Sequence, residues 1–415
     1  MTKEHSHPSR SFLGWLRRRV FPKLAKLCAF VGLMILGLWI TGRVLTDQYQ
    51  WSQYIWWVPA LWMLGSAWAC LFVSFAFAKF SRRLGGIFLR PILLVACLCS
   101  SIYLFFGVWH MHRIVLPYER AADSIRIGHW NHAGQQISSQ GWEQSLLDQG
   151  VDIVLLSNAR WGQERQIILN NFAPYAPEDK ERWVNYSYKI QGDPSHFWIQ
   201  DNALVASRYP MIRTGIVSFG SAERQQLLNH SSSNLGWIMF VEFDLAPIAN
   251  KDQSTPPPDP IPFVVWLVDL PSDPYNARQE SMQKTRDAID SWNGTGWKMG
   301  RHVWEQNNAS GDLFPAPDLI IGDFNTIRGS NSIHHLAPNM TDTFDTVGFG
   351  RGRSWVPHTK SWVINLGVLF ADWHIDLSFV NTDWKALRYK IQEIDQSGHA
   401  EHRMQILDLV KKTTK

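Results

Sequence analysis

The chain has 415 residues, of which 45% are hydrophobic and 18% charged. This length is enough for one large domain with a membrane anchor, or for two modest domains. All four cysteines lie in apolar segments before residue 100, so a disulfide framework and a thiolate metal site are excluded from the rest of the chain.

Charge is distributed unevenly along the chain. Residues 1–112 contain 12 Lys or Arg and two acids, for a net charge of +10. Residues 113–415 contain 28 Lys or Arg and 34 acids, for a net charge of −6. An acidic domain is poorly suited to binding a nucleic-acid backbone, because that affinity comes mostly from Lys and Arg. Nucleic acid is therefore an unlikely partner, and an extracytoplasmic nuclease is only a third possibility.

Three apolar stretches cover residues 24–40, 56–77 and 87–109. Each is close to the roughly 20 residues that a membrane-spanning helix needs. Each is also apolar on all faces, unlike an amphipathic helix that packs on a core. A cleaved signal peptide explains one such stretch but not three. The sequence therefore predicts three transmembrane helices, with a buried helical hairpin of a soluble protein as the alternative.

The basic residues of this region predict its orientation in the membrane. They are concentrated in the N-terminal tail and in residues 79–90, whereas residues 46–53 contain none. Because basic segments stay in the cytoplasm, we expect a cytoplasmic tail at residues 1–23. A multi-pass anchor follows at residues 24–112, and residues 113–415 are expected to form an extracytoplasmic domain of unknown oligomeric state.

Short β-type runs alternate with a few helical stretches after residue 113, which favours an α/β domain. Helices are predicted at residues 141–149 and 277–292, each followed by a glycine. Residues 247–262 and 293–317 are interpreted as a Pro-rich loop and a polar insertion. The predicted strands are 125–130, 152–156, 203–207, 237–243, 263–268, 319–321, 375–380 and 404–409.

The clearest local motif is Leu-Ile-Ile-Gly-Asp-Phe-Asn at residues 319–325. An apolar strand here ends in a turn that carries a carboxylate, Asp323, and an amide, Asn325. This pair suits a hard divalent cation and a phosphoryl oxygen, respectively. Taken alone, a strand that ends in Gly-Asp is more often a simple turn.

Other motifs accompany it in a characteristic order. Asn131 ends Ile-Gly-His-Trp-Asn, and Asn202 begins Asn-Ala-Leu-Val-Ala-Ser-Arg-Tyr-Pro. Trp-His-Ile-Asp-Leu-Ser-Phe-Val contains Asp376, and Glu-His-Arg-Met contains His402. Over residues 124–410 this series resembles the endonuclease/exonuclease/phosphatase superfamily of metal-dependent phosphoesterases. The resemblance implies a two-sheet mixed β-sandwich flanked by helices, here preceded by three transmembrane helices.

The resemblance also implies roles for individual residues. Asn131 and Asn325 contact the phosphate, and Asp323 contacts the metal. Asp376 orients the catalytic imidazole of His402, which acts at the phosphate or as a general base. Together, a metal and a carboxylate-oriented His would neutralise phosphoryl charge and activate water.

Three positions depart from the family pattern. Asn158 replaces the Glu that is the main magnesium ligand, Asp269 replaces a mid-domain His, and Glu401 replaces the Asp before the last His. The implied cofactor is Mg²⁺ or Mn²⁺, and the neutral Asn158 is expected to weaken its binding. The implied metal ligands are Asp323, Glu401 and Asn158, with Asp269 as a phosphate contact or as a ligand in a rearranged set.

Two functions compete at this point. The favoured one is a membrane-anchored phosphoesterase acting outside the cytoplasm on a phosphodiester or pyrophosphate, such as a membrane lipid or lipid-linked phosphate. The anchor with an outward-facing domain also looks like bacterial family members that act on such lipids. The alternative is a catalytically weakened relative, a pseudoenzyme that serves as a tethered binding or scaffold protein.

Overall fold

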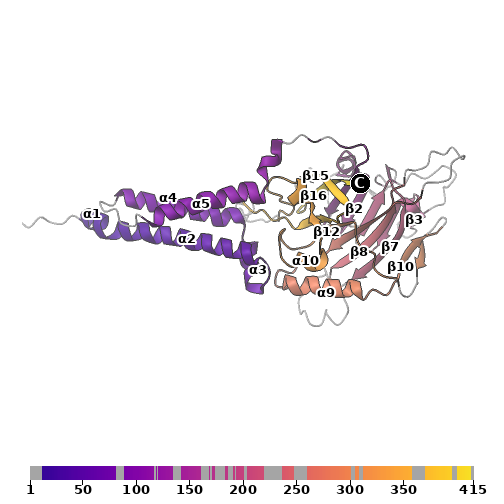
Figure 1. Ribbon diagram of the computed structural model, residues 1–415, viewed down its shortest axis with the longest axis horizontal. Helices are drawn as coiled ribbons and strands as arrows, with labels where there is room; N and C mark the ends of the chain where they lie inside the picture. The colour runs from indigo at the N-terminus through magenta and orange to yellow at the C-terminus, as the bar shows by residue number, and fades with distance from the viewer. Residues whose placement is uncertain are drawn as a thin grey trace, which may run out of the picture. The chain divides into compact units, whose positions relative to one another are not determined.

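The computed structural model divides into two compact units, one of residues 1–46 and 51–109 and the other of residues 47–50 and 110–415. Each unit is described by itself (Figure 1). The residues described are 12–80, 88–115, 118, 120–133, 142–159, 168, 171–172, 183–185, 190–191, 193–200, 203–218, 236–246, 259–300, 304–307, 312–357, 370–394 and 400–412.

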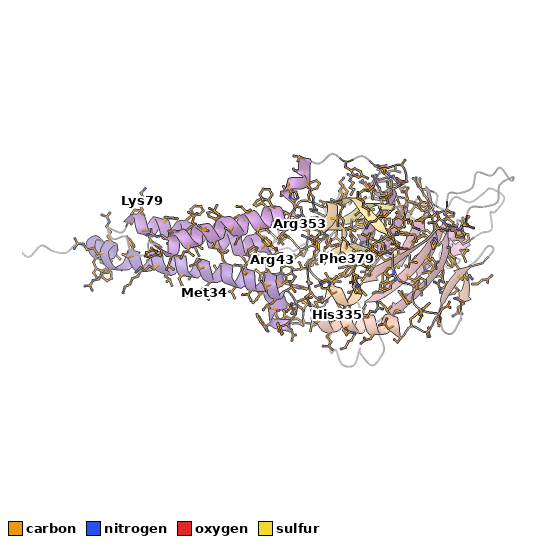
Figure 2. All side chains as sticks on the ribbon, viewed as in Figure 1. Met34, Arg43, Lys79, His335, Arg353 and Phe379 are labelled. Carbon is orange, nitrogen blue, oxygen red and sulfur yellow. The ribbon has the colours of Figure 1, made fainter. Side chains whose placement is uncertain are left out.

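The first unit consists of apolar helices, and three of its helical segments are long and apolar enough to cross a membrane. They cover Leu16–Leu45, Ala60–Phe80 and Leu89–Val108, so the three predicted spans are confirmed with shifted ends. Their outer surfaces are apolar, as Met34 illustrates (Figure 2). The helical elements are α1 (Phe12–Trp15), η1 (Leu16–Val20), α2 (Phe21–Leu45), α3 (Gln50–Trp57), α4 (Ala60–Phe80), α5 (Leu89–Ile102), and η2 (Tyr103–Val108).

Small residues and a proline determine the details of this unit. On α2, Ala25, Ala29 and Gly32 are buried, which lets neighbouring helices approach closely. The Ser74 hydroxyl on α4 donates a hydrogen bond of 2.6 Å to the Ala25 carbonyl. The second span begins later than predicted because Pro59 disfavours helix at the residue before it, which separates α3 from α4.

The second unit contains two large mixed sheets. The first sheet has the order β15-β16-β1-β2-β6-β5, in which only β1 and β2 are parallel neighbours. Its strands are β1 (Ile125–Asn131), β2 (Ile153–Ser157), β5 (Phe197–Gln200), β6 (Ala203–Ser207), β15 (Trp384–Gln392) and β16 (Met404–Lys411).

The second sheet has the order β11-β10-β7-β8-β9-β12-β14-β13, with β9 and β12 parallel. The predicted fold class, a two-sheet mixed β-sandwich with flanking helices behind three apolar spans, is therefore confirmed. The strands of this sheet are β7 (Met211–Ser218), β8 (Trp237–Asp244), β9 (Pro262–Asp269), β10 (Gly296–Met299), β11 (Trp304–Asn307), β12 (Leu319–Asp323), β13 (Thr341–Asp342) and β14 (Asp376–Val380). The remaining elements are β3 (Trp183–Asn185), β4 (Ile190–Gln191), α6 (Trp142–Leu147), α9 (Arg278–Asp290), α10 (Ile333–Leu336), α11 (Thr343–Val347), η3 (Met111–Val115) and η6 (Pro194–His196).

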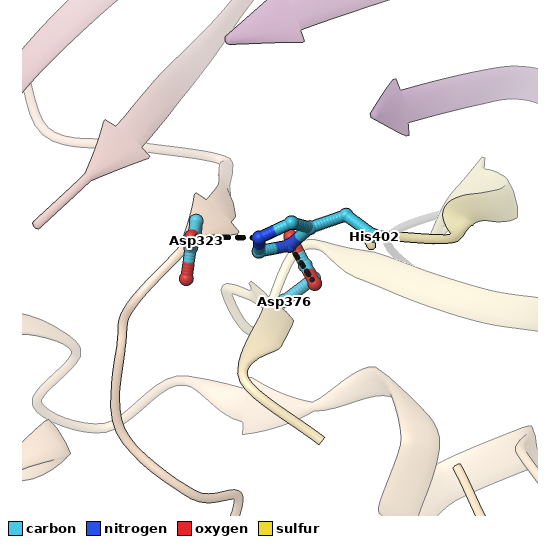
Figure 3. Close-up of side chains that lie close together, drawn as sticks. All are labelled: Asp323, Asp376 and His402. Atoms are coloured by element: carbon cyan, nitrogen blue, oxygen red, sulfur yellow. Dashed lines mark hydrogen bonds and ion pairs between the residues drawn. The ribbon is translucent and has the colours of Figure 1, made fainter. Parts of the chain in front are cut away.

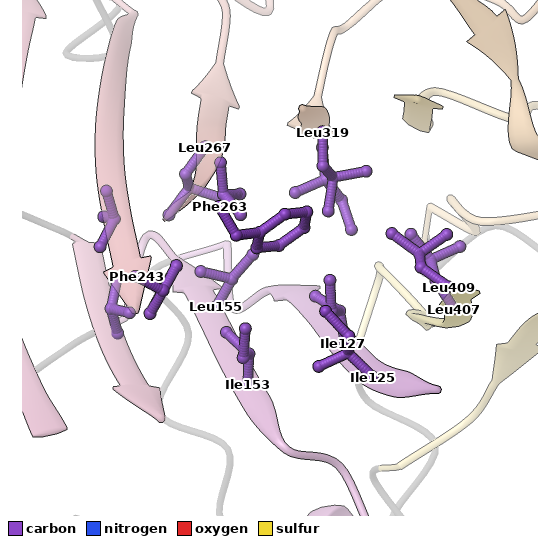
Figure 4. Packing of buried hydrophobic residues seen from close by; sticks show 14 of the residues in the cluster. Ile125, Ile127, Ile153, Leu155, Phe243, Phe263, Leu267, Leu319, Leu407 and Leu409 are labelled. Carbon is purple, nitrogen blue, oxygen red and sulfur yellow. The ribbon is translucent and has the colours of Figure 1, made fainter. Parts of the chain in front are cut away.

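The main core lies between the two sheets (Figure 4). Alternate residues of each strand face it, as Ile125 and Ile127 do on β1 and Leu319 and Ile321 do on β12. Helices cover the outer faces, because Leu146 of α6 and the buried face of α9 join two further apolar clusters. This arrangement makes the central strands buried on both sides and rigid.

All eight predicted strands and both predicted helices are present, but the list was incomplete. The interpretation of residues 293–317 as a polar insertion was wrong, because β10 and β11 form a hairpin there at the sheet edge. Edge strands carry polar residues and lack the apolar runs on which the prediction relied. The long β15 was missed because Lys and Arg alternate with its apolar residues and because it contains a bulge between Ala386 and Arg388. Of the predicted loop at 247–262, residues 247–258 lie outside the described residues.

Because of the inter-sheet core, we expect alanine substitution of a buried leucine to destabilise the protein much more than alanine substitution of an exposed one. Replacing Leu155, which is 0% exposed, by Ala should lower the free energy of unfolding by about 2–5 kcal/mol, because it leaves a cavity between the sheets. Leu313→Ala is the matched control, since Leu313 is 78% exposed. Thermal unfolding of the full chain in detergent, followed by tryptophan fluorescence, measures both. Equal melting midpoints for the two variants would contradict this core.

Candidate active site

The site lies at one end of the sandwich, where strands of both sheets begin or end. Since β12 is parallel to β9 and antiparallel to β14, the last residues of β9 and β12 meet the first residue of β14. Asp323 therefore pairs in register with Asp269 on one side and Asp376 on the other. All three carboxylates are buried.

Gly322 is required for this row of aspartates. Its φ is +152°, and a Cβ there would lie 1.9 Å from the backbone oxygen of Val268. Only glycine lets β12 approach β9 this closely immediately before Asp323. The Gly of the Gly-Asp-Phe-Asn motif is thus a packing requirement and not merely a turn.

His402 completes the cluster from the other sheet (Figure 3). Its Nδ1 lies 3.0 Å from Oδ2 of Asp376, and its Nε2 lies 3.9 Å from Oδ2 of Asp323. Trp130 holds the backbone here, because its Nε1 donates a hydrogen bond of 2.9 Å to the His402 carbonyl. With Nδ1 bound to Asp376, Nε2 is the imidazole atom that faces the rest of the site.

Two asparagines extend the cluster along the first sheet. Asn131, at the end of β1, donates from Nδ2 to Oδ2 of Asp323 at 2.7 Å. Its Oδ1 accepts from the backbone of Ala133 at 2.8 Å and from Nδ2 of Asn158 at 3.2 Å. Asn158 follows β2 with φ +50°, a conformation that Asn tolerates. Because its amino group is used in this chain, its carbonyl oxygen is the group it can offer to a ligand.

Asn325 is tied into the loops beside Asp323. Its backbone N–H donates to Oδ1 of Asp323 at 2.9 Å, and its Nδ2 donates to the Leu270 carbonyl at 2.7 Å. Asn325 thus links the loop after β12 to the loop after β9. Its predicted contact with a phosphoryl oxygen stays a prediction, as do the roles assigned to the other site residues.

Electrostatics in the cluster follow from burial. Burial and the charge of Asp376 raise the pKa of Asp323, although His402 and the hydrogen bonds from Asn325 and Asn131 act in the opposite direction. Burial alone lowers the pKa of His402, but the charge and hydrogen bond of Asp376, together with Asp323 and Asp269, outweigh it and raise that pKa to about 9. His402 is therefore an imidazolium at neutral pH in the metal-free chain.

The donors present fit a divalent cation. Asp323, Asp376 and His402 each offer a ligand atom within 4.8 Å of the others. Three carboxylates, including Asp269, act on one imidazolium, and the buried Arg278 also interacts electrostatically with Asp323. Acidic groups remain in excess, and a bound cation would relieve the repulsion that raises the pKa of Asp323.

Of the predicted metal ligands, Asp323 lies in this group and Asn158 reaches it through Asn131. Glu401 precedes His402, but its carboxylate is not part of the group within 4.8 Å. Its backbone carbonyl instead accepts a hydrogen bond of 2.7 Å from the Val356 N–H. Asp269 is also outside this group, although it pairs in register with Asp323, so the ligand set stays a prediction.

Several supporting residues escaped the sequence analysis. The Ser354 hydroxyl accepts hydrogen bonds of 3.0 Å from the backbone N–H groups of Ile375 and Asp376, which fixes the start of β14. Behind Asp376, the Tyr389 hydroxyl contacts His374 at 2.8 Å and Gln405 at 3.2 Å. These residues are distant in sequence and carry no local motif, so only the fold reveals them.

In sequence comparisons, no protein-family model and no curated protein matched the chain. In structure, the chain is similar to endonuclease/exonuclease/phosphatase proteins of Beutenbergia cavernae and Bacteroides thetaiotaomicron, each 12% identical with a TM-score of 0.40. These matches cover 71% of this chain and 72% and 100% of the other chains, respectively.

A humanized TDP2 of D. rerio is also similar, at 10% identity and a TM-score of 0.40, covering 69% of this chain and 99% of that chain. The proteins from B. cavernae and B. thetaiotaomicron carry the name of the family that the sequence resembles. Because all three TM-scores are below 0.5, the assignment of a two-sheet mixed sandwich rests on the strand order and register described above.

The contact between Asp376 and His402 leads to a prediction about the pKa of His402. In the presence of EDTA, Asp376→Asn should lower the pKa of His402 by about one unit or more. The substitution removes a negative charge that raises this pKa, whereas burial, which lowers it, is unchanged. In the original chain, protonated His402 stabilises the fold. This contribution is complete at pH values below the ordinary histidine pKa of 6.5, and it is lost as pH rises through about 9. Histidine hydrogen exchange followed by mass spectrometry measures the pKa.

The control for this titration is Asp383→Asn, which removes an exposed carboxylate of the same domain. It should leave the His402 pKa unchanged. An unshifted His402 pKa in Asp376→Asn would show that the two side chains do not interact as described.

Proposed function

We propose that this protein is a membrane-anchored, metal-dependent phosphoesterase that acts outside the cytoplasm on a phosphodiester or pyrophosphate bond of a lipid-linked substrate. The observation that carries the proposal is the cluster of His402, Asp376 and Asp323, with Asn131 bound to Asp323. An oriented imidazole beside a carboxylate that can hold a cation suits hydrolysis of a phosphate ester.

Each residue of the cluster has a chemical task in this proposal. Asp376 holds His402 by Nδ1, so Nε2 is the atom that donates to a phosphoryl or leaving oxygen. Asp323, with Asp269 in register beside it and Asn158 linked to it through Asn131, would hold Mg²⁺ or Mn²⁺. A divalent cation there supplies positive charge to the non-bridging oxygens of the phosphate. Asn131 keeps the Asp323 carboxylate oriented through the hydrogen bond from Nδ2.

The location and substrate class are supported by the sequence of the anchor. Its three apolar helices are long enough to span a bilayer, and the distribution of Lys and Arg favours an outward-facing domain with a cytoplasmic N-terminus. Tethering raises the effective concentration of the domain at a lipid headgroup. The net acidic charge of residues 113–415 disfavours a nuclease.

Asn158 favours a second candidate, a tethered relative with weakened catalysis that acts as a binding or scaffold protein. A neutral amide adds no charge to the ligand set, and Mg²⁺ sheds water reluctantly without carboxylates. The two candidates differ in whether the purified full chain with Mg²⁺ or Mn²⁺ hydrolyses phosphate esters.

The phosphoesterase proposal predicts that His402→Ala lowers hydrolysis by about 10²–10⁴-fold, since it removes the proton donor. The matched control is His334→Ala, which removes an exposed histidine of the same domain and should keep full activity. Phosphate release from lipid phosphodiester, phosphomonoester and pyrophosphate substrates measures the rates. Lack of hydrolysis of every substrate by the unaltered chain would favour the scaffold candidate.

A second prediction concerns the metal. Asn158→Glu should tighten Mg²⁺ binding by about tenfold, because it adds a charged oxygen ligand next to Asp323. Asn158→Gln keeps the neutral amide and should not tighten it. Isothermal titration calorimetry of the full chain compares the two variants. If Asn158→Glu binds Mg²⁺ no more tightly than Asn158→Gln, the cation site assigned to Asp323 is wrong.

A further inference from the structure

A cavity in the second unit is lined by described residues that do not include the three aspartates of the site. Its volume is about 560 Å³, within the range of roughly 300–1,000 Å³ typical of small-ligand pockets. None of its described lining residues is an acid. They are Phe344, Phe349, Arg351, Gly352, Arg353, Tyr389, Lys390, Ile391 and Arg403.

Four basic residues line this cavity, which we call the basic pocket, and three of them, Arg351, Arg353 and Arg403, act on one another electrostatically. Arg351 donates from one terminal nitrogen to the Ala371 carbonyl at 2.7 Å, which fixes its guanidinium. Arg403 pairs with Glu393 at 3.2 Å, and this acid also acts on Arg353. Even with Glu393 and Asp372, which acts on Arg351, the cations outnumber the acids.

The loop before Ser354 is shaped to present these arginines. Gly350 and Gly352, on either side of Arg351, both have positive φ, +88° and +62°, a conformation that glycine adopts without strain. A Cβ on Gly352 would lie 2.7 Å from Nδ1 of His374, so this position is limited to glycine. The loop thus packs tightly on the domain and holds two arginines at the cavity wall.

The cations of the pocket destabilise one another. Burial lowers the pKa of Arg353, and the charges of Arg403 and Arg351 lower it further. A bound anion would relieve this repulsion.

We propose that the basic pocket binds a phosphate group, held by Arg351, Arg353 and Arg403, at a site distinct from the cluster around Asp323. Arginine forks match phosphate oxygens well, and Phe349 and Ile391 offer an apolar wall to the rest of the ligand. The phosphate can belong to a lipid headgroup or be free in solution. The proposal does not depend on hydrolysis, since none of these side chains belongs to the cluster around Asp323.

The pocket also has a physical route to the candidate active site. Tyr389 lines the pocket and contacts the Asp376 carbonyl at 3.4 Å. Arg353 and Arg403 directly adjoin Ser354 and His402 in the chain. A ligand in the pocket therefore contacts the same segments that hold the Asp376–His402 pair.

Calorimetry of the full chain in nonionic detergent with EDTA tests this proposal. EDTA removes the cation on which phosphate binding at the aspartate cluster depends. The probes are inorganic phosphate, dihexanoylphosphatidic acid and dihexanoylphosphatidylcholine. We expect the phosphatidic acid or inorganic phosphate to bind, with the paired Arg351→Gln and Arg353→Gln substitutions weakening binding about tenfold or more.

Lys385→Gln is the control, because Lys385 is an exposed cation of the same unit and lies outside the pocket. It should bind like the original chain, and unchanged thermal unfolding checks that all variants are folded. Tighter binding of the phosphatidic acid than of phosphate assigns the ligand to a lipid, and equal binding assigns it to free phosphate.

Three results would overturn the proposal. The first is no binding of either phosphate probe. The second is an equal loss of binding in Lys385→Gln, which would indicate unspecific charge attraction. The third is equally tight binding of phosphatidylcholine, which would indicate that only the apolar wall is recognised.

Discussion

The burial of three carboxylates at one end of a single sheet is the constraint on which the site depends. Asp269, Asp323 and Asp376 end or begin three adjacent strands in register, so the sheet itself prevents them from separating. Burying an unpaired charge in a protein interior costs free energy. Here His402 and the hydrogen bonds to Asp323 offset only part of that free energy, so the pKa of Asp323 stays raised. The same excess of negative charge is what makes the site suited to a cation.

The fold supplies the rigidity that this arrangement needs. β9 and β12 are buried on both faces, by the inter-sheet core and by α9 with its neighbouring apolar cluster. Gly322 brings these two strands together at the level of the carboxylates. The other sheet contributes His402 and Asn131 from the ends of adjacent strands, β16 and β1. Because the core fixes both sheets, the site geometry is set without a ligand.

Sequence motifs predicted those parts of the site that lie at the ends of strongly apolar strands. Asp323, Asn131 and Asp376 follow or begin runs that are easily recognised, and the structure brings them together with His402. The place of Asp269 in the row depends on parallel pairing of β9 with β12, which no local pattern encodes. The basic pocket was hidden because the domain as a whole is acidic, and its cations come from two separate segments. Edge and amphipathic strands such as β11 and β15 were missed for a related reason, since their polar residues resemble loops.

The account predicts a cation at Asp323, and anomalous scattering from Mn²⁺-soaked crystals of the full chain tests this most directly. We expect a single strong peak at about 2.2 Å from a carboxylate oxygen of Asp323, on the side that faces Asp269 and His402. Crystals saturated with Mn²⁺ that show no peak at this end of the sandwich would contradict the account. The three aspartates would then have to be balanced by His402, Arg278 and protons on their own carboxyl groups.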